Sequence, residues 1–337
     1  MNNSQSAAVL GAGTAIVDLL VRVDDEFLAR ELPDGRGNTT WADAARLDEL
    51  ILRMNERGFL PEKAPGGSTG NLLCGLSELG CETRFLGWLG LDDDGMYYRD
   101  TFAEAGGGIH SFKYHPAKHT GRCLSLISPD ADRSMVTDLG AAGEMHVAEV
   151  LPSDLDGVGL LHTEGYLCGL NDRTFLPELL NRAKEAGIPV SFDLASYGIV
   201  REYKDELRGL LLDCVDVVFA NELEAAEFAG SNEPESMLAA LAELCPVAAV
   251  KLGALGSIVR MDGRTVRIPP EPAPPVDATG AGDLWQAGFL FGRLHHAAPE
   301  VCGHIGSILG AAAVSHFGAR LPEESWRMLR SRIRAMI

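Results

Sequence analysis

A run of small residues, Val276-Asp277-Ala278-Thr279-Gly280-Ala281-Gly282-Asp283, leads directly into the apolar, helix-compatible segment 284–289. The Pro-rich stretch 269–275 precedes it, so the Gly-Ala-Gly triplet lies where a loop becomes a helix. Small residues there let the backbone approach a ligand closely, and the N–H groups and dipole of the first helical turn favour an anion. Asp283 places a carboxylate in the same turn. An anion site beside an acid–base group is the arrangement that phosphoryl transfer requires.

The simplest interpretation of Gly280–Asp283 alone is a capped helix start, because Asp and small residues are common there. The longer string resembles the second signature of the PfkB family of ribokinase-like carbohydrate and nucleoside kinases, which usually reads Asp-Thr-x-Gly-Ala-Gly-Asp. Ala278 replaces the usual Thr, and Thr279 follows it. The resemblance implies that Asp283 takes the proton of the acceptor hydroxyl and that Thr279 lies at the nucleotide. It assigns the developing negative charge to Gly280, Ala281 and Gly282.

Composition limits the classes of function. The chain has 337 residues, of which 46% are hydrophobic, and a formal net charge of −19. Such an acidic chain is a poor partner for nucleic acid or for an anionic membrane, because both attract clustered Lys and Arg. It is compatible with one nucleotide whose phosphates are held by backbone N–H groups and a metal ion. The expected partner is therefore a small molecule.

Cysteine usage and the N-terminus indicate a cytoplasmic protein. None of the seven Cys residues belongs to a C-x-x-C pair, and most lie in apolar runs, as buried reduced thiols do. The first residues, Met1–Ser6, lack the charged region of a signal peptide, and no apolar run is long enough for a membrane span. A reducing compartment is the default for such a chain.

From residue 157 onward, apolar runs of strand length alternate with helical stretches. The runs are Val158–His162, Pro189–Asp193, Val215–Ala220 and Val247–Leu252. This alternation is typical of an α/β fold with a parallel sheet and helices on both faces. A hairpin over 257–268 is expected next, and three helices then close the chain, near 281–296, 299–317 and 322–334.

We expect a single domain over residues 1–337 that carries a small lid. Segments near 14–45 and 109–140 combine short strands with turn signals, and they could form a strand-rich lid over the carboxyl edge of the sheet. Ligands of open α/β sheets bind at that edge. An exposed lid sheet could pair with its twin in a homodimer, or it could stand alone.

Two N-terminal motifs resemble the acceptor site of the same kinases. The first, Gly11-Ala12-Gly13-Thr14-Ala15-Ile16, fails as a dinucleotide fingerprint, because Ile16 stands at the third Gly and a strand is expected to follow. The family carries an Asp near this point, and Asp18 matches it, although Thr14 replaces the common Asn. The second motif, Gly66-Gly67-Ser68-x-x-Asn71, resembles the first kinase signature. Carboxylates and amides suit hydroxyl groups, and the resemblance assigns acceptor binding to Asp18, Gly66, Gly67 and Asn71.

The same segment, Gly66-Gly67-Ser68-Thr69-Gly70, formally matches the G-x-S-x-G elbow of serine hydrolases, in which Ser68 would be the nucleophile. That elbow requires a strand directly before it, and Pro61–Pro65 is poor strand material. We therefore expect a kinase and keep the hydrolase as a remote alternative.

Residues 120–142 bear on the identity of the acceptor. Thr120-Gly121-Arg122-Cys123 and Leu139-Gly140-Ala141-Ala142 resemble the adenosine-kinase branch more than the ribokinase branch. Arg133 is the candidate cation for the transferred phosphate, because a guanidinium matches phosphate with its planar fork; an exposed turn residue is the alternative. A nucleoside would also need an apolar or aromatic wall for its base, and the candidates for that wall are Tyr166 and Leu167.

Three further motifs resemble the nucleotide and metal site of the family. Asn221-Glu222-Leu223-Glu224 matches Asn-x-x-Glu, which implies that Asn221 and Glu224 hold a hydrated Mg²⁺ from one face of a helix start. A capping pair is the simpler interpretation. The turn after the fourth apolar run resembles the ATP-bordering turn and contributes Lys251, Gly253 and Gly256. By analogy, the adenine pocket is assigned to Ala312 and His316.

The motifs follow the family order from about residue 8 to residue 334. The resemblance implies a ribokinase-like fold and transfer of the γ-phosphoryl group of ATP, with Mg²⁺, to a hydroxymethyl group of a sugar or nucleoside. A protein of the same fold that binds a sugar or nucleoside without transferring phosphate is the alternative. The sequence does not decide between sugar and nucleoside.

Overall fold

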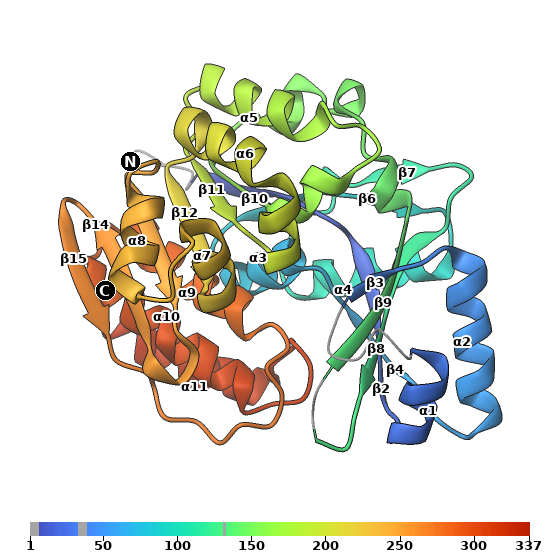
Figure 1. The fold of residues 1–337 in the computed structure, drawn as a ribbon. Coiled ribbons are helices and arrows are strands. Elements are labelled where there is room, and N and C mark those ends of the chain that lie inside the picture. Colours follow the sequence, from blue (N-terminus) through green and yellow to red (C-terminus); the bar gives the residue numbers. More distant parts are fainter. Residues whose placement is uncertain (1–6, 33–38, 131–132) are drawn as a thin grey trace.

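An eight-stranded sheet forms the centre of the protein. The structure is a computed structural model that describes residues 7–32, 39–130 and 133–337 (Figure 1). Six neighbouring strands are parallel: β5 (Thr83–Leu86), β1 (Ala8–Ala12), β10 (Val158–Glu164), β11 (Val190–Asp193), β12 (Val217–Asn221) and β13 (Val247–Lys251). An antiparallel hairpin of β14 (Ser257–Met261) and β15 (Arg264–Ile268) extends the sheet beyond β13. The predicted α/β sheet and its hairpin are confirmed.

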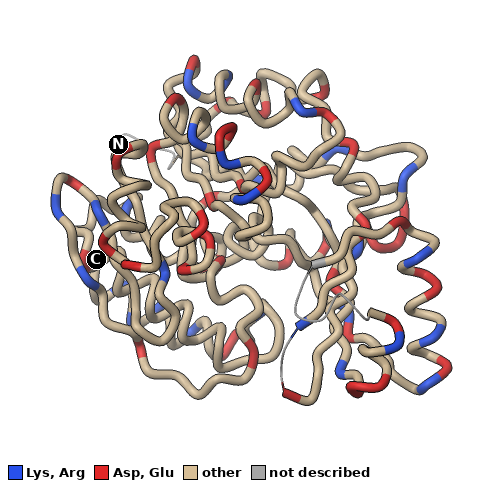
Figure 2. Tube along the Cα trace, in the orientation of Figure 1, with Lys and Arg blue, Asp and Glu red and all other residues tan. Residues whose placement is uncertain are grey.

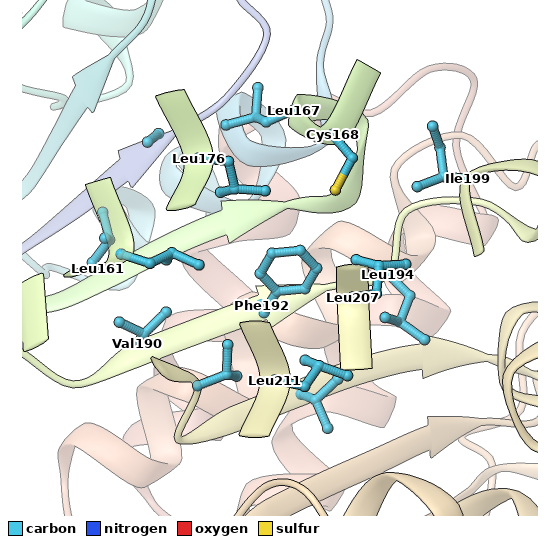
Figure 3. Packing of buried hydrophobic residues seen from close by; sticks show 14 of the residues in the cluster. Leu161, Leu167, Cys168, Leu176, Val190, Phe192, Leu194, Ile199, Leu207 and Leu211 are labelled. Carbon is cyan, nitrogen blue, oxygen red and sulfur yellow. The ribbon is translucent and has the colours of Figure 1, made fainter. Parts of the chain in front are cut away.

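Helices cover both faces of this sheet, because its inner strands are apolar on both sides. In β12, Val218 and Ala220 belong to one hydrophobic core, whereas Val217 and Phe219 belong to another, as the alternation of side chains along a strand requires. The first core is covered by α5 (Phe175–Glu185), α6 (Tyr197–Cys214), α7 (Glu222–Ala229) and α8 (Pro234–Ala242). The second is covered by α3 (Ser68–Glu78), α4 (Asp93–Glu104), α9 (Ala281–Leu294), α10 (Pro299–Val314) and α11 (Glu323–Arg334). Figure 3 shows part of the first core, where Phe192 of β11 packs among leucines from α5 and α6.

The lid is a second, smaller sheet with a core of its own. Its strands are β3 (Thr39–Trp41), β9 (Arg133–Gly140), β8 (Thr120–Ile127), β2 (Ile16–Arg22) and β4 (Glu62–Pro65), in that spatial order. One face is covered by α1 (Asp25–Glu31) and α2 (Ala44–Glu56), on the outer side of the lid in Figure 1. Phe27, Leu50 and Leu124 are among the buried residues between the sheet and these helices. A separate pair of short parallel strands, β6 (Trp88–Gly90) and β7 (Lys113–His115), lies outside the lid sheet.

The lid differs from the sequence expectation in two respects. Residues Pro61–Pro65 were expected to be poor strand material, yet Glu62–Pro65 pairs with β2 as strand β4. The strand is tolerated because β4 is the edge of the lid sheet, where the missing N–H of Pro65 breaks no inner ladder. The lid therefore continues past residue 45 to residue 65. Of the expected lid segments, residues 33–38 and 131–132 lie outside the described residues, as does the N-terminal stretch 1–6.

Charged residues of both signs occur throughout the fold, and Lys and Arg residues are dispersed along the chain among Asp and Glu residues (Figure 2). Among the described helices, none combines the length and the apolar character that crossing a membrane would require. Because α1 and α2 cover one face of the lid sheet, a homodimer that uses the lid would have to pair through these helices or through a strand edge. Dimer formation stays a prediction.

Candidate active site

One cavity of about 270 Å³ lies between the lid sheet and the carboxyl edge of the central sheet. The parallel strands all end at this edge, so residues that follow different strands meet there although they are far apart in sequence. The predicted site residues that line the cavity are Asp18, Gly67, Asn71, Arg133, Tyr166, Asn221, Glu224, Lys251, Thr279, Gly280, Gly282 and Asp283.

Asp283, in the first turn of α9, is held by two side chains from α3. Ser68 Oγ donates to Asp283 Oδ1 at 2.7 Å, and Asn71 Nδ2 donates to Asp283 Oδ2 at 2.9 Å. Burial raises the pKa of Asp283, while these two hydrogen bonds act in the opposite direction. A carboxylate with a raised pKa in a fixed orientation suits a general base. The bond from Ser68 to a carboxylate, with no histidine in that role, also removes the support for a serine nucleophile.

The start of α9 has the geometry of an anion site. Gly280 is the N-terminal cap and adopts the left-handed conformation, with φ of 71°. Asp277 stabilises the loop before Gly280 with three hydrogen bonds. Its Oδ1 accepts from the backbone N–H and the hydroxyl of Thr279, and its Oδ2 accepts from the N–H of Gly318. A Cβ atom on Gly282 would lie 3.3 Å from Lys251 Nζ, so an ammonium group stands directly beside the first helical turn. Helix N–H groups and a lysine together favour phosphate.

Asp18 on β2, which is predicted to bind the acceptor, lines the cavity from the lid side. Its carboxylate lies against the backbone of Gly66, where an added Cβ atom would come within 2.3 Å of Asp18 Cγ and Oδ1. Burial raises the pKa of Asp18 to about 7, with Asp283 acting in the same direction and Arg133 and Arg320 acting against it. The carboxylate is therefore near the midpoint of its titration at neutral pH.

We expect the affinity for the acceptor to fall as the pH drops through about 7. Ionised Asp18 accepts hydrogen bonds from acceptor hydroxyls, whereas the protonated acid loses part of that capacity. The KM of the acceptor should then be lowest well above pH 7 and rise as the pH falls through about 7, towards the value of the protonated form. Measuring KM for the acceptor and for ATP across this range tests the assignment. Asp18→Asn should remove the pH dependence of the acceptor KM, and a flat profile in the wild-type protein would contradict it.

The lid contacts the anion site through Arg133. This residue begins β9, and its Nη1 donates to Thr279 Oγ1 in the loop before α9. A guanidinium carried by the lid thus lies beside the helix start that bears Asp283. The predicted role of Arg133 at the transferred phosphate fits this position.

Asn221 and Glu224 form a reciprocal capping box at the start of α7. Asn221 N and Nδ2 donate to the two oxygens of Glu224, and Asn221 Oδ1 accepts from Glu224 N at 2.9 Å. Burial, followed by the charge of Asp193, raises the pKa of Glu224. Asp193 Oδ1 lies 3.6 Å from Lys251 Nζ and has no hydrogen-bond partner among the described residues.

These groups fit a hydrated divalent cation. Asp193, Glu224 and Asp283 all line one cavity in which Lys251 is the neighbouring ammonium group, so a cation would relieve their mutual repulsion. Within residues 7–32, 39–130 and 133–337, no cluster of three His, Cys, Asp or Glu side chains could hold a metal directly. Mg²⁺ readily retains water ligands, so these carboxylates could hold it through water without a cluster of three direct ligands.

Several predicted residues are not part of the cavity lining. Leu167 belongs to the hydrophobic core, because the short helix Gly165–Gly169 directs Tyr166 toward the cavity and its neighbour away from it. His316 hydrogen-bonds Ala312 O and Ser325 Oγ within its own region. The other predicted residues outside the lining are Gly66, Gly253, Gly256, Ala281 and Ala312.

Sequence reasoning missed three functional candidates. The sequence offers Ser68 only as the nucleophile of the hydrolase alternative, but its hydroxyl donates to Asp283. Asp193 ends a predicted strand, so its place at the carboxyl edge was a usable signal. Trp41 ends β3 and lines the cavity from the lid side with 52% of its surface exposed; no motif singles it out.

Comparison with known proteins places this geometry in context. The model of the pfkB family of carbohydrate kinases matches residues 42–326. The structure of adenosine kinase from Sinorhizobium meliloti has a TM-score of 0.88 and 29% identity, covering 97% of this chain and 99% of that one. The structure of a probable sugar kinase from Rhizobium etli has a TM-score of 0.89 and 28% identity, covering 98% of this chain and 99% of that one. A fructokinase from Klebsiella pneumoniae is 28% identical over 71% of this chain and 80% of its own length. The predicted ribokinase-like fold is confirmed.

Proposed function

The chain belongs to the pfkB family of carbohydrate kinases, and on that premise we propose that it phosphorylates the hydroxymethyl group of a nucleoside. It is a phosphotransferase that uses ATP and has an alcohol group of a sugar or nucleoside as acceptor. The choice of a nucleoside, the roles of individual residues and the use of Mg²⁺ are the proposed part.

The proposed mechanism assigns one task to each side of the cavity. Asp18 and Asn71 hold the acceptor hydroxyls, and Asp283 takes the proton of the attacking hydroxyl as the bond to phosphorus forms. The N–H groups at Gly280–Gly282, with Lys251 and Arg133, hold the charge that develops on the transferred phosphoryl group. Mg²⁺, held through water by Asn221, Glu224 and Asp193, would neutralise phosphate charge when bound. The hydrogen bond from Arg133 to Thr279 joins the lid to the loop before α9. Closure of the lid over both substrates would exclude water as a competing acceptor.

The observation that favours a nucleoside is the apolar wall of the lid. On the lid side the cavity is lined by Ile16, Cys123, Met135, Leu139 and Trp41, and by two hydroxyl residues, Ser125 and Thr137. A bare sugar offers mainly hydroxyl groups, which the five apolar side chains of this wall cannot bind. A nucleobase offers a flat aromatic face, which stacks on an exposed tryptophan.

Replacing Trp41 with Ala should raise the KM for the nucleoside. Stacking of a base on an aromatic side chain contributes about 1–3 kcal/mol, so we expect an increase of roughly 5- to 150-fold, while the KM for ATP is unchanged. Trp41→Phe should retain most of the affinity. Leu60→Ala, which removes another exposed apolar side chain of the lid (75% exposed) outside the cavity lining, serves as the control. An unchanged nucleoside KM in Trp41→Ala would exclude this wall as the base site.

The proposed function is tested by ADP release from the purified protein with ATP and Mg²⁺. The acceptors to compare are adenosine, inosine, guanosine, cytidine, ribose, fructose and 2-keto-3-deoxygluconate. We expect a signal with a nucleoside that is lost on chelation of the metal and restored by Mg²⁺. A signal with a free sugar alone would overturn the nucleoside assignment and leave the kinase class intact.

A further inference from the structure

A fully buried carboxylate, Glu164, lies behind the cavity without lining it. Glu164 is the last residue of β10 and has 0% of its surface exposed. Its Oε1 accepts from Thr14 N at 3.0 Å and from Thr14 Oγ1 at 2.9 Å. Its Oε2 accepts from Thr69 N at 2.9 Å and from Thr69 Oγ1 at 2.7 Å. Four donors from two distant segments therefore satisfy one carboxylate.

The chain around this carboxylate is shaped to admit Thr69. A Cβ atom on Gly11 would lie 2.6 Å from Thr69 Cγ2, and one on Gly13 would lie 2.4 Å from Thr69 Oγ1. Glycine at both positions thus allows α3 to approach the end of β1. The Gly-Ala-Gly string that fails as a dinucleotide fingerprint has a packing explanation in this contact.

Glu164 joins the two segments that carry the reacting groups. Through Thr69 it holds the first turn of α3, and Ser68 and Asn71 of the same turn donate the two hydrogen bonds that orient Asp283. Through Thr14 it holds the turn that leads into β2, the strand of Asp18. A carboxylate that has only acceptor sites matches four donors, and two of these are backbone N–H groups whose direction is fixed.

We propose that Glu164 is a positioning residue for phosphoryl transfer, which holds the start of α3 so that Ser68 and Asn71 keep Asp283 aligned with the acceptor hydroxyl. The inference rests on the proposed function. Glu164 does not touch the cavity and acts only through Thr69 and Thr14. Because hydrogen bonds to a carboxylate lower its pKa, loss of this alignment should also raise the pKa of Asp283.

The test compares Glu164→Gln, Thr69→Val and Thr69→Ser with the wild-type protein. In Glu164→Gln an amide NH₂ group faces fixed N–H donors, so the start of α3 must shift. We expect kcat to fall on the order of 10²-fold in Glu164→Gln, since small misplacements near the reacting atoms have effects of that size. In Thr69→Val, which removes one hydroxyl, kcat should fall less. In Glu164→Gln and in Thr69→Val, the acid limb of the kcat–pH profile should move to higher pH. Thr69→Ser, which keeps the hydroxyl, should restore kcat and the profile.

Leu211→Ala supplies the control for stability. Leu211 is buried in the core formed with α6, away from the cavity lining (Figure 3), so this variant should melt at lower temperature with unchanged kcat and pH profile. Wild-type kcat and profile in Glu164→Gln, or equal impairment of Thr69→Ser and Thr69→Val, would overturn the positioning role. If Glu164→Gln does not fold, the comparison of kcat and pH profile between Thr69→Ser and Thr69→Val tests the positioning role. A wild-type protein without turnover would overturn the proposed function and this inference together.

Discussion

Asp283→Asn should lower kcat by about 10²- to 10⁴-fold, the range that a positioned general base contributes. The substitution keeps the shape of the side chain and removes its ability to take a proton. Ser68 can still donate to the remaining oxygen, so the local structure should persist. Steady-state turnover with the best acceptor measures the effect, and equilibrium binding of ATP shows whether the nucleotide half of the site is intact.

The stability of Asp283→Asn provides an independent check on the charge of this residue. Burial raises the pKa of Asp283 in the folded protein. A carboxyl group whose folded pKa is raised disfavours folding above that pKa, where it must be ionised while buried. The Asn variant should therefore be at least as stable as the wild type at neutral pH.

A matched control for this substitution is Asp93→Asn. Asp93 also lies in the first turn of a helix, α4, but it is exposed and does not line the cavity. Its replacement should leave turnover unchanged. Turnover in Asp283→Asn above about a tenth of the wild-type value would contradict the role of general base.

Gly280→Ala should damage the anion site as well as the backbone. Gly280 has φ of 71°, and an added Cβ atom would lie 2.5 Å from Ala319 Cβ. The left-handed conformation alone costs a residue with a Cβ atom about 1–2 kcal/mol. The contact with Ala319 must also displace the start of α9, and losing one aligned donor at such a site lowers kcat by about 10²- to 10³-fold.

Gly230→Ala separates these two effects. Gly230 caps α7 with φ of 68°, and an added Cβ atom would meet nothing within 4 Å. Chemical denaturation should show a loss of about 1–2 kcal/mol in Gly230→Ala and at least as much in Gly280→Ala. Only Gly280→Ala should also lose turnover. Equal turnover in the two variants would show that the start of α9 does not hold the transferred phosphoryl group.

The parts of the site that the sequence predicts are those carried by contiguous motifs at helix starts. Asn221–Glu224 begins α7 at the end of the parallel strand β12, Asn71 lies in the first turn of α3, and Gly280–Asp283 begins α9. The approximate strand and helix ranges of the central sheet follow in the same way from apolar periodicity.

The residues that the sequence does not predict depend on contacts between distant segments. Glu164 meets Thr69 and Thr14 across 95 and 150 positions. The pairing of β1 with β10 brings Thr14 to Glu164, and the packing of α3 against the end of β1 brings Thr69 there. Leu167 was assigned to the base wall because it is apolar and adjacent to Tyr166; the direction of each side chain in that short helix is set by packing, which sequence periodicity does not resolve. The sequence does not predict strand β4, because its prolines argue against a strand, whereas an edge strand tolerates proline.

The lid has its own sheet, its own two helices and a buried core centred on residues such as Phe27 and Leu50. The wall that faces the acceptor belongs to this unit, whereas Gly280–Asp283 and Lys251 belong to the main body. The wall proposed to select the acceptor and the proposed general base Asp283 thus come from different units of one chain, although the lid also carries Arg133. Under the proposed roles, substitutions at the apolar wall positions can diversify the range of acceptors during evolution or by engineering while Asp283 and Lys251 stay unchanged.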